Sequence, residues 1–110
     1  MVRVKDCVRF KCLPLEFHTL CMVLRDAAEE QKTEATITGA AYEEYKKGSY
    51  HDRGYAWDVR IQSIPHPLKY VCEIRSALKH IDSRFRVVYG DANHTDHIHI
   101  EYRYDHKVKK

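Results

Sequence analysis

Two stretches of the chain, residues 49–60 and 96–101, combine imidazole and carboxylate side chains. In the first stretch the candidates for chemistry are His51 and Asp58, with Gly54 between them. A glycine permits the tight backbone that a loop histidine needs in order to turn over a strand aspartate. Catalytic zinc takes three protein ligands from His, Asp, Glu or Cys and keeps a fourth position open for water. The first stretch therefore offers two ligands of a one-zinc site.

The third ligand would come from His94, His97 or His99. Alternation along a strand puts His97 and His99 on the same face, so their spacing leaves the choice between them open. Asp96 precedes His97 at the expected start of the strand. A carboxylate there could take a proton from a water molecule whose pKa zinc lowers to about 7, and pass it to a leaving amine. An isolated H-x-H pair is more often exposed than metal-binding, so the two stretches predict a zinc hydrolase only in combination.

The composition is that of an ordinary globular domain. With 110 residues the chain is long enough for one hydrophobic core, and we expect a single domain over residues 1–110. Hydrophobic residues make up 44% and charged residues 32%, both typical of soluble proteins. No apolar run is long enough to cross a bilayer, and charges interrupt the N-terminus too early for a secretory signal. We therefore expect a monomer, made in the cytoplasm without a signal peptide and without a membrane partner.

The net charge of +3 gathers near the C-terminus, at Arg103, Lys107, Lys109 and Lys110. Such a tail is more often solvated than a dedicated binding arm. It is compatible with a weak preference for an anionic polymer such as a cell wall or nucleic acid. No basic helix or nucleic-acid-binding motif accompanies it, so we do not expect nucleic acid as a partner.

The four cysteines, Cys7, Cys12, Cys21 and Cys72, form no C-x-x-C pair. Cys21 and Cys72 fall in apolar stripes, which predicts buried free thiols. A Cys7–Cys12 disulfide is compatible with the spacing, but a chain without a signal peptide favours the reduced state.

Hydrophobic periodicity predicts two helices and several short strands. The expected elements, in order, are an edge strand or extended arm at 2–10, a helix at 15–31, strands at 35–38 and 54–60, a helix from 65–67 to 81, a strand at 85–89, a turn at 90–93 and a last strand at 97–104. The final two strands should form a hairpin. This order predicts an α+β fold with a small, largely antiparallel sheet and two main helices packed on it.

The same periodicity predicts which side chains face the core. In the strand at 54–60, Tyr55, Trp57 and Val59 alternate with a second face that carries Asp58 and Arg60. For the first helix the expected inward residues are Leu20, Val23, Leu24, Ala27 and Ala28. For the second helix they are Leu68, Val71, Cys72, Leu78 and Ile81.

The two stretches together resemble the zinc D,D-peptidase family. The S-x-H-x-x-G-x-A-x-D pattern at residues 49–58, followed by D-x-x-H at residues 96–99 within an H-x-H, is similar to that family's motif. The family includes D-alanyl-D-alanine carboxypeptidases, D-Ala-D-Ala dipeptidases and bacteriophage L-alanyl-D-glutamate endolysins, and it shares its fold with the Hedgehog signalling domain. Short phage-encoded members are the most similar. The order of the motifs matches from Thr36 to Tyr102, 67 of the 110 residues.

The resemblance implies one zinc ion held by His51, Asp58 and His99. It implies that Asp96 is the general base, and it selects His99 over His97 as the third ligand. A Hedgehog-type version of the α+β fold is expected on the same ground.

The resemblance also implies how substrate is held. Ser49 matches a serine beside the substrate, and His97 would support the ligands or stabilise the tetrahedral oxyanion. Many relatives have an upstream Ser-Gly-x-Arg whose arginine grips the substrate, whereas residues 38–41 read Thr-Gly-Ala-Ala here. Arg60 or Arg53 could bring a guanidinium in its place, and we favour Arg60.

The expected function is that of a zinc metallopeptidase that hydrolyses a peptide bond in peptidoglycan stem peptides, during phage lysis or as part of a virion. Carboxypeptidase and endopeptidase specificities are both compatible with the motifs. The alternative is a non-catalytic zinc-binding module of the same fold that recognises cell wall or a protein partner.

Overall fold

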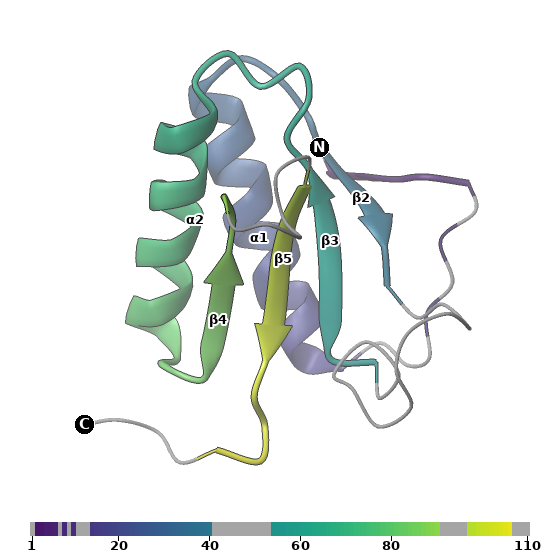
Figure 1. Cartoon of the computed structure of the whole chain (residues 1–110), viewed down its shortest axis with the longest axis vertical. Coiled ribbons are helices and arrows are strands. Elements are labelled where there is room, and N and C mark those ends of the chain that lie inside the picture. Colours follow the sequence, from purple (N-terminus) through teal and green to yellow (C-terminus); the bar gives the residue numbers. More distant parts are fainter. Residues whose placement is uncertain are drawn as a thin grey trace.

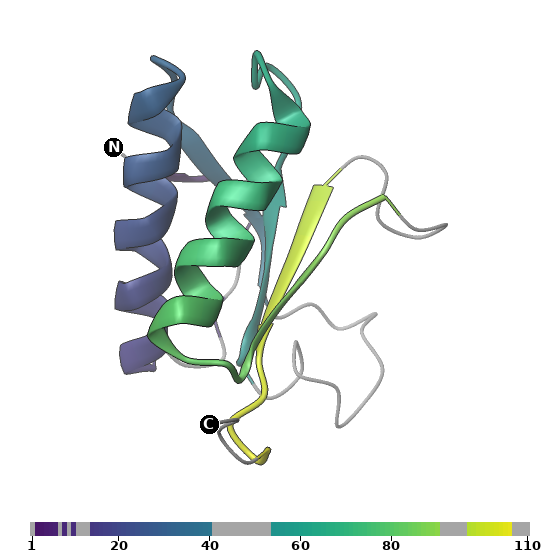
Figure 2. The same ribbon diagram turned by 90° about the vertical axis from the view of Figure 1, so that its left-hand side faces the viewer.

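A layer of two helices covers one face of a mixed β-sheet (Figure 1, Figure 2). The computed structural model describes residues 2–6, 8, 10, 14–40, 54–90 and 97–106. Within these ranges the elements are β1 (Val2–Val4), α1 (Leu15–Glu30), β2 (Ala35–Gly39), β3 (Ala56–Arg60), α2 (Pro67–Ile81), β4 (Phe85–Val88) and β5 (His97–Tyr102). The predicted α+β class and the predicted order of elements are confirmed.

The strands of the described sheet lie in the order β1-β2-β3-β5-β4. Only the β1–β2 pair is parallel, and the other three pairs are antiparallel. β1 therefore lies at one edge as a short strand, and the final hairpin of β4 and β5 lies at the other edge, as predicted. Because β5 inserts between β4 and β3, the last described strand lies beside β3, more than 30 residues earlier in the sequence.

Helix α1 follows its predicted amphipathic pattern. The helix begins after Pro14, which is the N-cap residue and has an extended backbone conformation. A proline suits this position because its fixed φ and missing N–H cost nothing before the first turn. The buried residues are Leu20, Val23, Leu24, Ala27 and Ala28, the predicted set. This stripe at three- and four-residue spacing places α1 flat against the sheet.

The predicted inward face of α2 is wrong at three positions. Leu68 is 71% exposed, Ile81 is 56% exposed, and Cys72 is also exposed. The buried residues are Tyr70, Val71, Ile74 and Leu78. At about 100° per residue, Leu68 and Cys72 point away from this stripe, whose middle lies near Ile74. Ile81 continues the stripe but is the last residue of the helix, where it lines a groove between α1 and α2.

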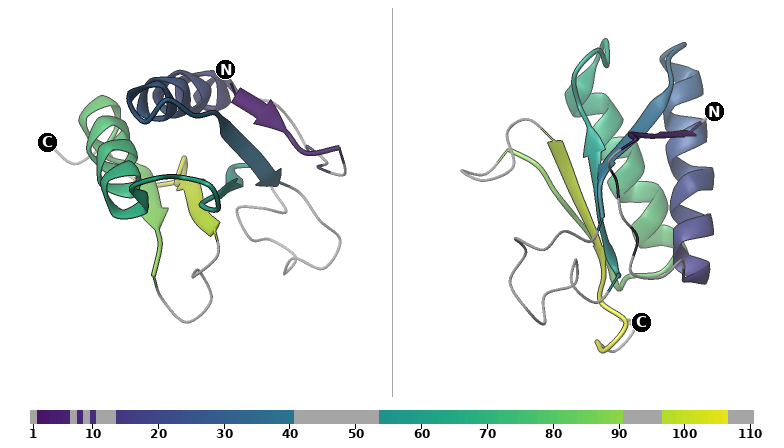
Figure 3. Two further views of the ribbon diagram at one scale, coloured as in Figure 1. Left: turned by 90° about the horizontal axis from the view of Figure 1, so that it is seen from above. Right: turned by 90° about the vertical axis from the view of Figure 1, so that its right-hand side faces the viewer.

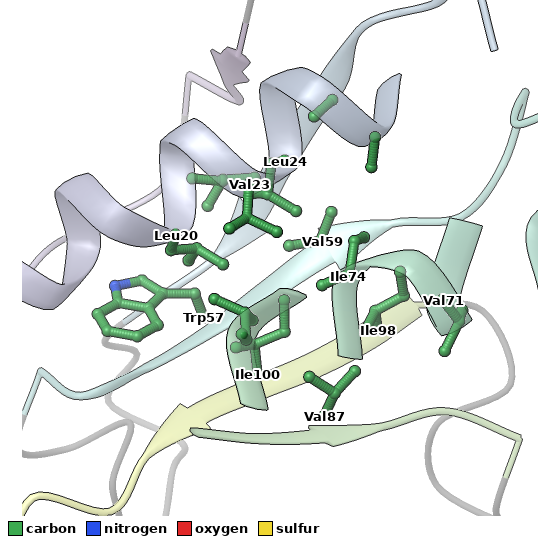
Figure 4. Close-up of a cluster of buried hydrophobic side chains, with 14 of the residues drawn as sticks. Leu20, Val23, Leu24, Trp57, Val59, Val71, Ile74, Val87, Ile98 and Ile100 are labelled. Atoms are coloured by element: carbon green, nitrogen blue, oxygen red, sulfur yellow. The ribbon is translucent and has the colours of Figure 1, made fainter. Parts of the chain in front are cut away.

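The core lies between the helices and one face of the sheet (Figure 3, Figure 4). Trp57 and Val59 of β3, together with Ile98 and Ile100 of β5, are fully buried there. In Figure 4 they point toward α1 and α2, with Val87 of β4 beside them. Because successive strand residues point to opposite faces, the residues between them lie on the other side of the sheet. We call that side, opposite to α1 and α2, the far face.

Of the cysteines, Cys21 is half-buried and Cys72 is exposed, and both are free thiols. Cys72 is therefore not the buried thiol that its neighbours in the sequence suggested. Cys7 and Cys12 lie outside the described residues. In the described part of the chain, neither helix has the length and apolar character needed to span a membrane.

Candidate metal centre

The far face brings the two predicted chemical stretches together. In the register of β3 with β5, Asp58 lies opposite His99 and Arg60 lies opposite His97. Directly opposed residues of antiparallel strands project on the same side with their Cβ atoms about 5 Å apart. The predicted placement of His97 and His99 on one face is therefore confirmed, and Asp58 joins them from the neighbouring strand.

The carboxylate of Asp58 faces both imidazoles. Its Oδ1 atom lies 3.4 Å from Nδ1 of His99 and 3.6 Å from Nε2 of His97. These distances are long for hydrogen bonds, which are usually below about 3.2 Å. Two ligand atoms on one tetrahedral zinc ion, each about 2 Å from the metal, are separated by ~3.3 Å. The Asp58–His99 spacing suits two ligands of a shared ion.

Glu101 and Arg103 hold the other side of His99. Nε2 of His99 donates to Oε1 of Glu101 at 2.8 Å, and Nε of Arg103 donates to Oε2 of Glu101 at 2.8 Å. Glu101 is only 6% exposed. We call Asp58, His97, His99, Glu101 and Arg103 the far-face cluster. No role for Glu101 is predicted from the sequence. The expectation that Arg103 lies in a solvated tail is wrong, because its guanidinium contacts Glu101.

A signal for both residues was present in the sequence. Positions 97, 99, 101 and 103 alternate along one strand direction, so Glu101 and Arg103 continue the side that His97 and His99 begin. A buried carboxylate requires hydrogen-bond donors, and a histidine and an arginine two residues to either side can supply them.

Electrostatics within the cluster favour one positive imidazole between two negative carboxylates. Burial by itself lowers the pKa of His99, but hydrogen bonds and charges from Asp58 and Glu101 outweigh it and raise the pKa to about 9. For Glu101, burial raises the pKa, and the stronger opposing effect of His99 and Arg103 lowers it to about 2. A zinc-bound histidine must be neutral, so a metal ion at this position would take the place of a proton.

The donor atoms of the described cluster suit zinc. Imidazole nitrogen and carboxylate oxygen are both common zinc ligands, and Nδ1 of His99 faces Asp58 while Nε2 faces a second carboxylate. Zinc-binding histidines commonly donate their remote N–H to such a carboxylate. No group of three or more His, Cys, Asp or Glu side chains poised for a metal occurs among the residues that the structure describes. The described pair of Asp58 and His99 therefore fits two of the three predicted ligand positions.

The remaining predicted site residues divide into two groups. His51, Ser49 and Asp96, together with the alternative Arg53, lie outside the described residues. Arg60 is at the end of β3, and its exposed side chain lines a shallow pocket. The other residues lining that pocket include Arg3, Glu34, Thr36 and Gln62.

The described histidines outside the two stretches are exposed: His18, His66, His80 and His106. Among the histidines that the structure describes, only His97 and His99 are partly buried.

Comparison with protein-family models, with curated proteins and with solved structures gives no match for this chain. The resemblance of the two motifs to zinc D,D-peptidases therefore stays a prediction. The Hedgehog-type form of the α+β fold also stays a prediction.

Proposed function

We propose that this protein is a zinc-dependent peptidase that hydrolyses a peptide bond in peptidoglycan stem peptides. One observation carries the proposal. Asp58 and His99, which are far apart in the sequence, lie opposite each other on the far face with ligand atoms 3.4 Å apart. Both residues occupy the positions that the peptidase-like motif assigns to the metal.

In this proposal His51, Asp58 and His99 hold the zinc ion. Zinc, when bound, supplies a Lewis acid that acidifies water and polarises the scissile carbonyl. Asp96, which directly precedes β5, accepts a proton from the attacking water and returns it to the leaving amine. In this proposal the third residue of β5, His99, is a zinc ligand, and the residue just before β5, Asp96, is the general base.

His97 and Arg60 would act on the substrate. His97 lies on the far face with Nε2 at 3.6 Å from Asp58, close enough to donate toward the oxyanion that develops beside the ligands. Arg60 is opposite His97 on β3 and is exposed, so its guanidinium can pair with a substrate carboxylate. Ser49 would border the substrate on the side of the first stretch.

The test is digestion of purified peptidoglycan by the zinc-loaded protein, with and without a chelator, followed by mass spectrometry of the muropeptides. We expect new amino termini with zinc and none with chelator, and the product masses identify the bond. The Asp96→Ala variant should keep zinc and lose hydrolysis by at least about 100-fold, as for a general base. Asp26→Ala, at an exposed aspartate of α1, is the matched control and should retain full activity.

Two results would overturn the proposal. Undiminished hydrolysis by Asp96→Ala would remove the assigned mechanism. A protein that binds zinc and purified peptidoglycan but releases no amino groups would instead be a non-catalytic recognition module. Glu101 and Asp58 are only 6% and 9% exposed, and such burial also suits a zinc ion that is held permanently in a non-catalytic module.

A further inference from the structure

His99 lies between two carboxylates, one of which is much closer to its ring than the other. The contact of Nε2 with Glu101 is 2.8 Å, whereas the contact of Nδ1 with Asp58 is 3.4 Å. An ionised carboxylate only accepts hydrogen bonds, so the short contact requires a hydrogen on Nε2. In the neutral imidazole the lone pair then lies on Nδ1, directed at Asp58.

Glu101 is itself prevented from turning. Its second oxygen accepts from Nε of Arg103 at 2.8 Å, so each carboxylate oxygen is engaged by a different donor. His99, Glu101 and Arg103 alternate along one direction of chain, and the strand geometry that spaces them also aligns the three side chains. Arg86 of β4 lies opposite Glu101 in the β4–β5 register.

Glutamine could not replace Glu101 without loss. Its single carbonyl oxygen could accept from His99 or from Arg103, while its amide nitrogen would face the other donor. The two contacts therefore select a carboxylate at this position, although the strand pairing alone would tolerate many residue types.

We propose that Glu101, clamped by Arg103, is a positioning residue that fixes the His99 ring with the Nδ1 lone pair facing the metal site. This inference rests on the proposed zinc site but not on peptidase activity. Glu101 sets the zinc affinity of the site without touching the ion, by holding the ligand in the one orientation and tautomer that can bind. Outer partners of this kind change metal affinity by about 10- to 100-fold.

The first measurement is zinc affinity by competition with a chromophoric chelator. Glu101→Ala should weaken binding by about 10- to 100-fold, and Glu101→Gln and Arg103→Gln should each weaken it by a smaller factor. Asp82→Asn is the matched control, because it alters another partly buried carboxylate paired with an arginine, outside the far-face cluster. It should lower stability and leave zinc affinity unchanged.

The second measurement is the ring state of His99 by long-range proton–nitrogen NMR of the zinc-loaded protein. We expect protonated Nε2 and metal-bound Nδ1 in the wild type, and a mixture of ring states in Glu101→Ala. A wild-type protein that does not bind zinc would refute the proposed function. Wild-type zinc binding with unchanged affinity and ring state in a folded Glu101→Ala variant would refute the positioning role alone.

Discussion

Glu101 and Tyr102 are neighbours on β5, yet they belong to two different polar clusters on opposite sides of the sheet. Glu101 joins the far-face cluster through His99 and Arg103. Tyr102 is buried on the helix side and donates its hydroxyl to Asp82 at 2.7 Å. Both clusters contain a carboxylate paired with an arginine, but they differ in how many donors surround each carboxylate.

We call Asp82, Arg84 and Tyr102 the corner cluster, since Asp82 caps the end of α2 where the chain turns into β4. Asp82 accepts from the backbone N–H, Nε and Nη2 of Arg84 and from the Tyr102 hydroxyl, at 2.7–3.3 Å. The Arg84 guanidinium also lies 5.2 Å from the centre of the Tyr102 ring. Here several donors surround one carboxylate at hydrogen-bond distance, and these contacts connect the end of α2 to β4 and β5.

The far-face cluster has the opposite balance. Two carboxylates, Asp58 and Glu101, share the imidazole of His99, and the Asp58 contacts are longer than a good hydrogen bond. Such a cluster carries excess negative charge when His99 is neutral, and a divalent cation would neutralise it. Among the described residues, the corner cluster has more donors per carboxylate than the far-face cluster, and this difference distinguishes a structural contact from a candidate metal site.

Removing the central carboxylate of the far-face cluster should have the largest effect. Asp58→Asn keeps the shape of the side chain but takes away a charged ligand, so zinc affinity should fall by more than about 100-fold, beyond the loss expected for an outer partner. Chelator competition measures it. Affinity within threefold of the wild type would exclude Asp58 as a ligand.

The corresponding change in the corner cluster should affect stability instead. Asp82→Ala removes the acceptor of the Arg84 and Tyr102 hydrogen bonds and should cost about 2 kcal/mol of the free energy of unfolding, the size expected for hydrogen bonds to a charged group. Urea denaturation measures this loss. Zinc affinity should stay at the wild-type value, and a marked loss of zinc would mean that the two clusters are not independent.

The pH dependence of stability distinguishes the clusters in the metal-free protein. His99 has a pKa raised to about 9, so its contribution is complete below about pH 6.5 and is lost as the pH rises through 9. The loss should be on the order of 2 kcal/mol in the wild type, and His99→Gln should flatten this alkaline limb. Denaturation with chelator between pH 6 and pH 10 measures this loss. An unchanged alkaline limb in the variant would contradict a positively charged His99 between Asp58 and Glu101.

On the acid side the two clusters should act together. Hydrogen bonds from Arg84 hold the pKa of Asp82 below its usual range, and His99 and Arg103 lower that of Glu101 to about 2. Both contributions are present above about pH 4.5 and are lost as the pH falls toward the folded-state pKa values. Asp82→Asn should remove part of this acid limb and keep the alkaline limb intact.

The smallest effect is expected just beyond the far-face cluster. Arg60→Ala removes an exposed arginine, so the free energy of unfolding should change by less than about 0.5 kcal/mol and zinc affinity should be unchanged. If Arg60 grips a substrate carboxylate, KM should rise several-fold with little change in kcat. An unchanged KM would remove Arg60 from the substrate site.

Much of the fold followed from periodicity alone. The buried stripe of α1 and the alternation of Trp57 and Val59 were predicted because each is set by local geometry, 3.6 residues per turn or two per repeat. The inward face of α2 was mispredicted because aliphatic Leu68 was preferred to Tyr70. Only packing against α1 and the sheet determines which of two adjacent stripes is buried.

The candidate site divides in the same way. Asp58 and His99 were identified from residue type and motif, and their shared face from strand alternation. The register that puts Asp58 opposite His99 depends on β5 inserting between β3 and β4, which is a property of the whole sheet. Arg103 was misassigned because residue composition cannot show that a charged side chain folds back on a buried carboxylate.

Element order, the α+β class and the candidate metal-binding residues could be predicted from the sequence, since these depend on side-chain chemistry and short-range periodicity. Which of those residues meet, which nitrogen of His99 faces Asp58, and how Glu101 and Arg103 hold the ring all depend on the tertiary structure. The physical reason is that a hydrogen bond or a ligand contact needs atoms within about 3 Å. Such proximity between separate strands is set by the pairing of the sheet, and no local pattern encodes it.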